Sequence, residues 1–249
     1  PPPHFFSTPT PETPLLRSLV GSEMCIRDST SSFVANVFSL MFTALIISGI
    51  SAVWFASEEM KSYIVSYEGG LTTFGWITTL APLGLVMLIG FGFNKYSVKF
   101  LLGIFILYST LTGISLSTIF AIYSTSSIAT TFFISALTFG IMALTGYTTK
   151  TDLTKMGSLL MMGLIGIVLA SIINMFIGSS FMDYIISIIG VLVFTGLTAY
   201  DVQKIKNIGN QIDQGSETAQ KMMVLGALTL YLDFINLFLM LLRLFGNRD

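Results

Sequence analysis

Seven stretches of roughly 20 mainly apolar residues follow one another along the chain, which is the length that a helix needs to cross a bilayer. Each residue of an α-helix adds only about 1.5 Å, so shorter apolar runs would not span the hydrocarbon core. We therefore predict an all-α membrane protein, a bundle of seven transmembrane helices with short connections. The predicted spans are Phe33–Ala56, Thr73–Phe93, Val98–Tyr123, Ile128–Tyr147, Gly157–Ile177, Phe181–Lys204 and Met222–Phe245.

The composition agrees with a membrane protein and excludes several functional classes. Charged residues make up 10% of the 249 residues, whereas a soluble domain has about 25%. The net charge of −1 gives no reason to expect a nucleic-acid partner. Because Cys25 is the single cysteine and His4 the single histidine, the spans hold neither a Cys/His metal cluster nor a Ser/His/Asp triad. We expect neither an enzyme nor a resident cofactor.

The first 31 residues differ from the rest of the chain. They contain six of the seven prolines, together with the single cysteine and histidine. The run SLVGSEMCIRDS resembles translated sequencing-adapter read-through, and the stretch lacks the apolar core of a secretory signal peptide. We expect residues 1–31 to be a disordered or artefactual tail, and residues 32–249 to form the seven-helix transmembrane domain.

Basic residues orient the predicted bundle, because cytoplasmic loops of membrane proteins are enriched in Lys and Arg. With a cytosolic N-terminus, seven basic residues outside the tail lie in cytosolic segments and three in outer segments. The cytosolic ones are Lys95, Lys99, Lys150, Lys155, Lys204, Lys206 and Lys221, and the outer ones are Lys61, Arg243 and Arg248. We predict a multi-pass protein of the bacterial inner membrane with its N-terminus in the cytosol.

Asp201 and Asp233 lie well inside the apolar spans, where an ionisable side chain costs several kcal/mol on insertion scales. Each falls on a helical stripe of mostly small or polar residues at intervals of three or four. The stripe of the sixth span is Ser187, Gly190, Phe194, Thr198 and Asp201, and that of the seventh is Gly226, Thr229, Asp233, Asn236 and Met240. We predict that both aspartates face the interior of the bundle, with Thr198, Thr229 and Asn236 as supporting polar groups.

Two carboxyl groups that meet at low dielectric constant titrate as a coupled pair that shares one proton. Such a pair senses pH, and its ionised form offers oxygen ligands to a cation such as Ca²⁺. The predicted depths of the two side chains in the membrane argue against their contact. Asp233 is about 16 Å from the start of its span, whereas Asp201 is three residues from the end of its own. Close approach requires tilted helices, or helices that continue through Ile205–Lys221.

Two other arrangements of the aspartates remain open. Each could simply accept a hydrogen bond from Asn236, Tyr200 or Tyr231. A lysine could instead form an ion pair with Asp201 and hold the bundle closed until the carboxyl groups are protonated, and Lys95 and Lys99 are predicted on the same side of the membrane.

The same region carries a family resemblance. LTAYDVQKIK followed by LTLYLDFINLFLMLLRLFG resembles the C-terminal signature of the Bax inhibitor motif (TMBIM) family, in its short bacterial branch. YSTLTGISLSTIFAIY is similar to the third span of that family, and FISALTFGIMALTGYTTKTDLTKMGSLL to its fourth span, the following loop and the start of its fifth. The resemblance extends from about Phe33 to Gly246.

This resemblance implies a seven-helix fold with the last helix at the centre. It also implies a pH-sensitive calcium leak that is gated by an aspartate pair matching Asp201 and Asp233. The family's latch arginine falls on Lys95, and lysine keeps the charge without the bidentate guanidinium. Ca²⁺ is thus expected as a permeant or bound ion.

Two alternatives come from other functional classes. Some bacterial relatives bind and modulate a membrane-bound protease, so a non-transporting regulator is the second hypothesis. Two aspartates on adjacent spans also suggest an intramembrane aspartyl protease, in which two carboxyl groups activate a water molecule. The second motif of that enzyme class, Gly-x-Gly-Asp, is absent before Asp233, where the sequence is Leu230-Tyr231-Leu232.

Overall fold

A computed structural model describes residues 14–66, 70–93, 95–213 and 215–247, with side chains described from Thr30 onward. Within these residues the chain is helical and forms no strand beyond an isolated bridge between Val65 and Leu71. The elements, in chain order, are α1 Pro14–Phe55, α2 Glu58–Ile64, α3 Thr73–Gly92, α4 Val98–Leu116, the short 3-10 helix η1 Ser117–Ala121, α5 Thr125–Thr148, α6 Thr154–Ile177, α7 Ser180–Gln211 and α8 Glu217–Phe245.

Seven segments of the described chain are long and apolar enough to cross a membrane, as the sequence predicts. They are Thr30–Phe55, Thr73–Gly92, Val98–Ala121, Thr125–Thr148, Thr154–Ile177, Ser180–Gln211 and Glu217–Phe245. The outer helices present large apolar side chains to the surroundings, including Phe91 and Phe176, which are 86% and 81% exposed. A surface of this kind requires lipid around it.

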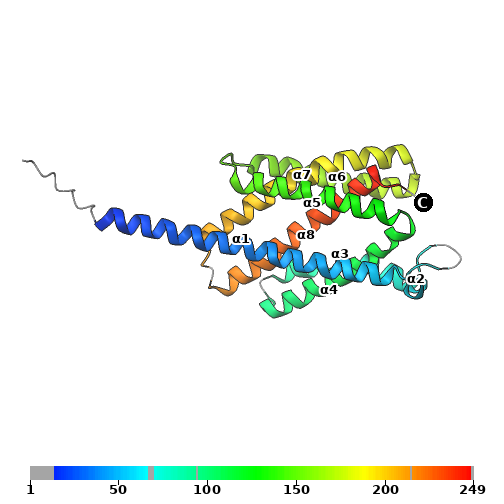
Figure 1. The fold of residues 1–249 in the computed structure, drawn as a ribbon, viewed down its shortest axis with the longest axis horizontal. Coiled ribbons are helices and arrows are strands. Elements are labelled where there is room, and N and C mark those ends of the chain that lie inside the picture. The colour runs from blue at the N-terminus through cyan, green and yellow to red at the C-terminus, as the bar shows by residue number, and fades with distance from the viewer. Residues whose placement is uncertain (1–13, 67–69, 94, 214, 248–249) are drawn as a thin grey trace, which may run out of the picture.

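The last helix, α8, lies at the centre of the bundle and runs obliquely through it (Figure 1). It packs against α1, α4, α5 and α7. In the most apolar window of α8, 67% of the residues are buried, whereas the corresponding value for the peripheral α6 is 11%. The predicted fold class, including the central last helix, is therefore confirmed.

The two helices that carry the aspartates are longer than the sequence predicts. α7 continues seven residues past Lys204 to Gln211, and α8 begins five residues before Met222, at Glu217. These extensions add about 10 Å and about 7 Å of helix. The segment Ile205–Lys221, which we predict as a polar connection, is therefore mostly helical, and Asp201 lies well inside α7 rather than near its end.

The N-terminal part of α1 projects beyond the bundle (Figure 1). Its helix begins at Pro14, so the backbone of residues 14–31 is helical, while residues 1–13 lie outside the described part of the chain. The prediction that residues 1–31 are an artefactual or disordered tail stays a prediction.

Candidate functional site

Asp201 and Asp233 are brought together by α7 and α8, which pack side by side along much of their length. Both side chains are buried, with 8% of Asp201 and 5% of Asp233 exposed. Their burial follows from the stripes described above, because residues three or four apart share one face of a helix. The predicted facing arrangement of the two stripes is present.

The two carboxyl groups lie within hydrogen-bonding reach of each other. The Oδ2 atom of Asp233 is buried and receives no hydrogen bond from any conventional donor in the described part of the chain. Two ionised carboxylates are both acceptors, so they can form a hydrogen bond only when one of them holds a proton. The α7–α8 contact thus places two carboxyl groups where a hydrogen bond between them would require one shared proton.

Of the two acids, Asp201 lies beside a cavity in the described part of the chain. Asp201 lines a space of about 190 Å³ that is formed by α7, α8 and the start of the α1 span. Thr229 and Lys204 also line this space. Lys204, one turn beyond Asp201, is close enough to interact with it electrostatically, and we did not single it out from the sequence. Its spacing of three residues from Asp201 on one helix could have indicated the interaction.

The predicted supporting groups have partners on their own helices. The hydroxyl groups of Thr198 and Thr229 donate to the carbonyl oxygens of Phe194 and Leu225, at 2.8 and 3.0 Å. The amide of Asn236 donates to the carbonyl oxygen of Leu232 at 2.8 Å. These residues make the walls of the site polar without donating to the aspartates.

The tyrosines that could have been alternative partners are engaged elsewhere. The hydroxyl of Tyr231 lies 2.6 Å from that of Ser48 on α1, which also donates to the carbonyl oxygen of Ser109 on α4. The ring of Tyr200 occupies the space beside Gly157 on α6. These contacts leave the opposite carboxyl group as the neighbour of each aspartate.

Lys95, the predicted latch, is exposed and follows the end of α3. The ion pair found in the described residues joins Lys221 to Glu217, so Lys95 does not reach either aspartate in this structure. The structure thus brings together Asp201 and Asp233 but does not add Lys95 to them.

A second, polar cavity of about 730 Å³ opens at the opposite end of the bundle, and no sequence motif points to it. It is lined by residues that include Asn174, Asp183, Ser187 and Arg243. Asn174 donates to Asp183 at 2.7 Å. Ser187 belongs to the stripe that leads along α7 towards Asp201, so the cavity lies at the far end of the same face.

An apolar contact separates this polar cavity from the aspartates. Gly190, one turn after Ser187, packs so closely against Met240 that a Cβ atom at position 190 would lie 2.8 Å from the Met240 sulfur. Phe194, the next residue of the stripe, is 4% exposed. The described structure therefore has a polar cavity at one end of the α7–α8 face, a mainly apolar cavity with Asp201 and Lys204 in its wall towards the other, and a closed apolar segment between them.

These features define a polytopic membrane protein whose central helix carries one half of a buried acid pair. The family profile described as "Inhibitor of apoptosis-promoting Bax1" matches residues 30–249. The chain therefore belongs to the Bax inhibitor motif family, as its C-terminal motifs predict.

Bacterial relatives match over nearly the same range. The "Inner membrane protein YbhL" of Escherichia coli K12 is 45% identical over 223 residues, which cover 89% of this chain and 94% of that protein. An uncharacterised protein of Borreliella burgdorferi is 47% identical over 218 residues, 88% of this chain and 93% of its own length. An uncharacterised protein of Rickettsia prowazekii is 43% identical over 216 residues, covering 87% and 89%.

Proposed function

We propose that the protein is a pH-sensitive cation leak, with Ca²⁺ as the ion that its site suits, and that Asp201 and Asp233 form the sensor. The observation that carries this proposal is the contact between the two buried carboxyl groups, one of which has an oxygen without a donor. If the contact between the two carboxyl groups needs a shared proton, loss of that proton destabilises the contact. Membership of the family supports the same reading.

The direction of the pH response follows from the shared proton. While one proton bridges the pair, α7 and α8 stay together. Loss of that proton leaves two negative charges in a medium of low dielectric constant, where their repulsion is much stronger than in water. Separation of the helices, or entry of a cation, relieves the repulsion. Flux should therefore rise as the pH rises.

The incomplete ligand set favours passage over tight binding. Ca²⁺ takes about six to eight oxygen ligands, and the pair supplies at most four. In the described residues no group of three or more acidic, His or Cys side chains could hold a metal ion. Water or backbone oxygens would complete the shell, so the ion would be held briefly and released.

The orientation and location are part of the proposal. The ends of α3, α5 and α7 carry most of the loop lysines, and the positive-inside rule assigns that end to the cytosol. The relative named as an inner membrane protein supports the same membrane for this chain. The cavity beside Asp201 would then face the cytosol and the larger polar cavity the outside.

The test is Ca²⁺ entry into liposomes that contain the purified protein, followed with a trapped indicator from about pH 6 to about pH 8, on both sides of neutrality. We expect flux to rise with pH by up to about tenfold per unit, the limit for loss of one proton. Asp201→Asn and Asp233→Asn should each abolish this rise, because neither variant can form the doubly charged pair. Asp213→Asn, at an exposed acid between α7 and α8, is the matched control and should behave as the wild type.

Three outcomes contradict the proposal. Absence of flux, or flux that ignores both substitutions, excludes the leak. Flux that instead rises on acidification would favour a lysine latch over the shared proton. Copurification of a membrane-bound protease without flux would favour the regulator, and cleavage of a transmembrane peptide that is lost in both variants would favour an aspartyl protease.

A further inference from the structure

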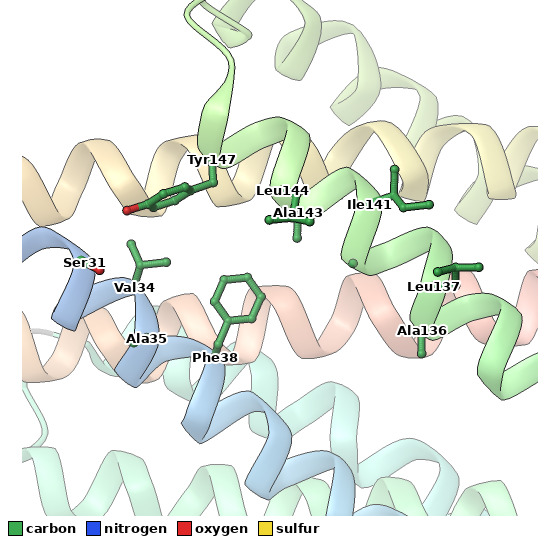
Figure 2. Close-up of a pocket in the computed structure, with 11 residues that line it drawn as sticks. Ser31, Val34, Ala35, Phe38, Ala136, Leu137, Ile141, Ala143, Leu144 and Tyr147 are labelled. Atoms are coloured by element: carbon green, nitrogen blue, oxygen red, sulfur yellow. The ribbon is translucent and has the colours of Figure 1, made fainter.

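A groove of about 600 Å³ lies between α1 and α5, away from the aspartates. Its walls are apolar and include Val34 and Phe38 from α1 with Leu137, Gly140 and Leu144 from α5 (Figure 2). Leu137 and Leu144 are 67% and 66% exposed, so the groove opens sideways from the bundle. Both helices are membrane spans, and the groove therefore opens into lipid rather than water.

Gly140 lines the groove without a side chain, which leaves room in its wall. A Cβ atom on Gly140 would meet nothing within 4 Å, so this glycine packs against no other helix. An apolar cavity without polar partners does not hold ordered water. The space is thus suited to a hydrocarbon chain.

One end of the groove is polar and carries a positive charge. Figure 2 shows Ser31 and Tyr147 at this end. Lys206 of α7 donates from Nζ to the carbonyl oxygen of Tyr147 at 2.7 Å and lies 4.9 Å from the centre of its ring. An ammonium group has three donors, so two remain available. In the described part of the chain no carboxylate forms an ion pair with Lys206.

We propose that this groove is a binding site for an anionic phospholipid, with an acyl chain between α1 and α5 and the phosphate group beside Lys206. Basic pockets between transmembrane helices bind anionic headgroups on the cytosolic side, which is where the positive-inside rule assigns Lys206. A methylene group needs roughly the ~30 Å³ that a water molecule occupies in the liquid, so the groove holds one acyl chain.

The test uses the full-length protein in nanodiscs that contain equal parts of phosphatidylglycerol and phosphatidylcholine. After mild extraction, native mass spectrometry counts the lipids that stay bound. We expect the wild type to retain phosphatidylglycerol in preference to phosphatidylcholine. Gly140→Phe, which fills the groove, should abolish this preference, and Lys206→Gln should reduce it about fivefold, the effect expected for one lysine.

Matched controls separate a site from general effects on the fold. Gly166→Phe places the same ring at another glycine with nothing within 4 Å, on the exposed side of α6. Lys155→Gln removes an exposed lysine at the same end of the bundle. Both variants should retain lipid as the wild type does. Equal retention of the two lipids by the wild type would overturn the proposal. So would an equal loss of bound phosphatidylglycerol in a variant and its control. So would a dimer that Gly140→Phe dissociates while bound lipid is unchanged, because the groove would then be an interface between copies.

Discussion

At the scale of single residues, the two aspartates differ in their surroundings. Asp201 lines the small cavity and has Lys204 nearby, whereas Asp233 lies behind it and faces the carboxyl group of Asp201. A proton that leaves the pair would therefore pass through Asp201. On the proposed function, this asymmetry would let the pair exchange protons with one side of the membrane without an open path across it.

Asp152, in the connection between α5 and α6, provides a pH-dependent contact outside the membrane spans. Its Oδ1 accepts hydrogen bonds from the backbone N–H and the hydroxyl of Thr154, at 2.9 and 2.6 Å. These bonds favour the ionised form and lower the pKa of Asp152 below its ordinary value. A lowered pKa means that the contact adds stability above the ordinary pKa and loses it as the pH falls through the lowered one.

We therefore expect Asp152→Asn to lower the Tm of the detergent-solubilised protein slightly at neutral pH. The difference from the wild type should shrink on acidification and disappear only below the lowered pKa of Asp152, where the wild-type side chain also becomes neutral. Thr154→Val, which removes one of the two donors, should give part of the same loss. A Tm difference for Asp152→Asn that does not change with pH would show that the lowered pKa does not contribute to folding stability.

The residues of the site could be predicted from the sequence, but their contact could not. Depth in an apolar span and helical spacing are enough to identify Asp201 and Asp233 and the faces on which they lie. Whether the two carboxyl groups meet depends on the offset between two antiparallel helices. That offset depends on where each helix ends and how obliquely α8 crosses the bundle, and neither quantity follows from local sequence.

At the scale of elements, hydropathy locates the part of a helix that lies in the membrane and not the helix itself. The segment after Lys204 is polar, and for that reason we predict it as a connection. Its backbone nevertheless continues in helix to Gln211, and its Ile205 and Gly209 are buried. Gly209 packs against Phe33 of α1, so tertiary contacts support the extension.

The glycines show a similar limit of sequence reasoning. Five glycines in the predicted spans can be read as sites of close helix packing, and the structure bears this out for Gly113 and Gly163. The other three, Gly103, Gly140 and Gly166, have no neighbouring atom within 4 Å of an added Cβ, so that reading is wrong for them. Composition alone does not distinguish a glycine that faces a helix from one that faces lipid.

Gly146 makes the closest such contact in α5. A Cβ atom at this position would lie 2.1 Å from the carbonyl oxygen of Ala199 on α7, two residues before Asp201. Because a backbone atom cannot rotate away, Gly146→Ala should push α5 and α7 apart and destabilise the protein by about 1–3 kcal/mol. The measurement is Tm in detergent, with the pH dependence of Ca²⁺ flux recorded alongside.

The matched control for Gly146→Ala is Gly140→Ala on the same helix, where the new methyl group meets nothing. That substitution should be neutral or slightly stabilising, because alanine favours a helix over glycine by about 1 kcal/mol. If the two variants have equal Tm values, the close approach of α5 and α7 at Gly146 is not what positions the site.

At the scale of the whole molecule, the number of spans and the fold class follow from the sequence, but the burial of each helix does not. Both the interior and the lipid-facing surface are apolar, so hydropathy does not reveal which helix is central. The resemblance of the C-terminal motifs to the family supplies that information for α8. The outer polar cavity could not be predicted either, because its residues come from the ends of several helices.

The apolar segment between the two cavities should act as the closed barrier of the proposed leak. An ion that leaves the outer cavity meets Met240 packed on Gly190 before it can reach Asp233, and a narrow apolar passage excludes water and ions. Met240→Ala removes most of this contact. We expect it to raise Ca²⁺ flux several-fold at low pH, where the wild type is closed, and so to flatten the pH profile measured in liposomes.

Loss of a buried methionine also destabilises a protein by about 2–5 kcal/mol, so flux must be compared at a temperature where the variant is still folded. Met161→Ala, at a methionine that is 47% exposed on α6, removes the same atoms from the lipid-facing surface and should leave flux unchanged. Met240→Leu, which keeps the volume, should keep the barrier. An unchanged pH profile in Met240→Ala would show that the contact between Met240 and Gly190 is not the barrier. The aspartate pair alone would then account for closure.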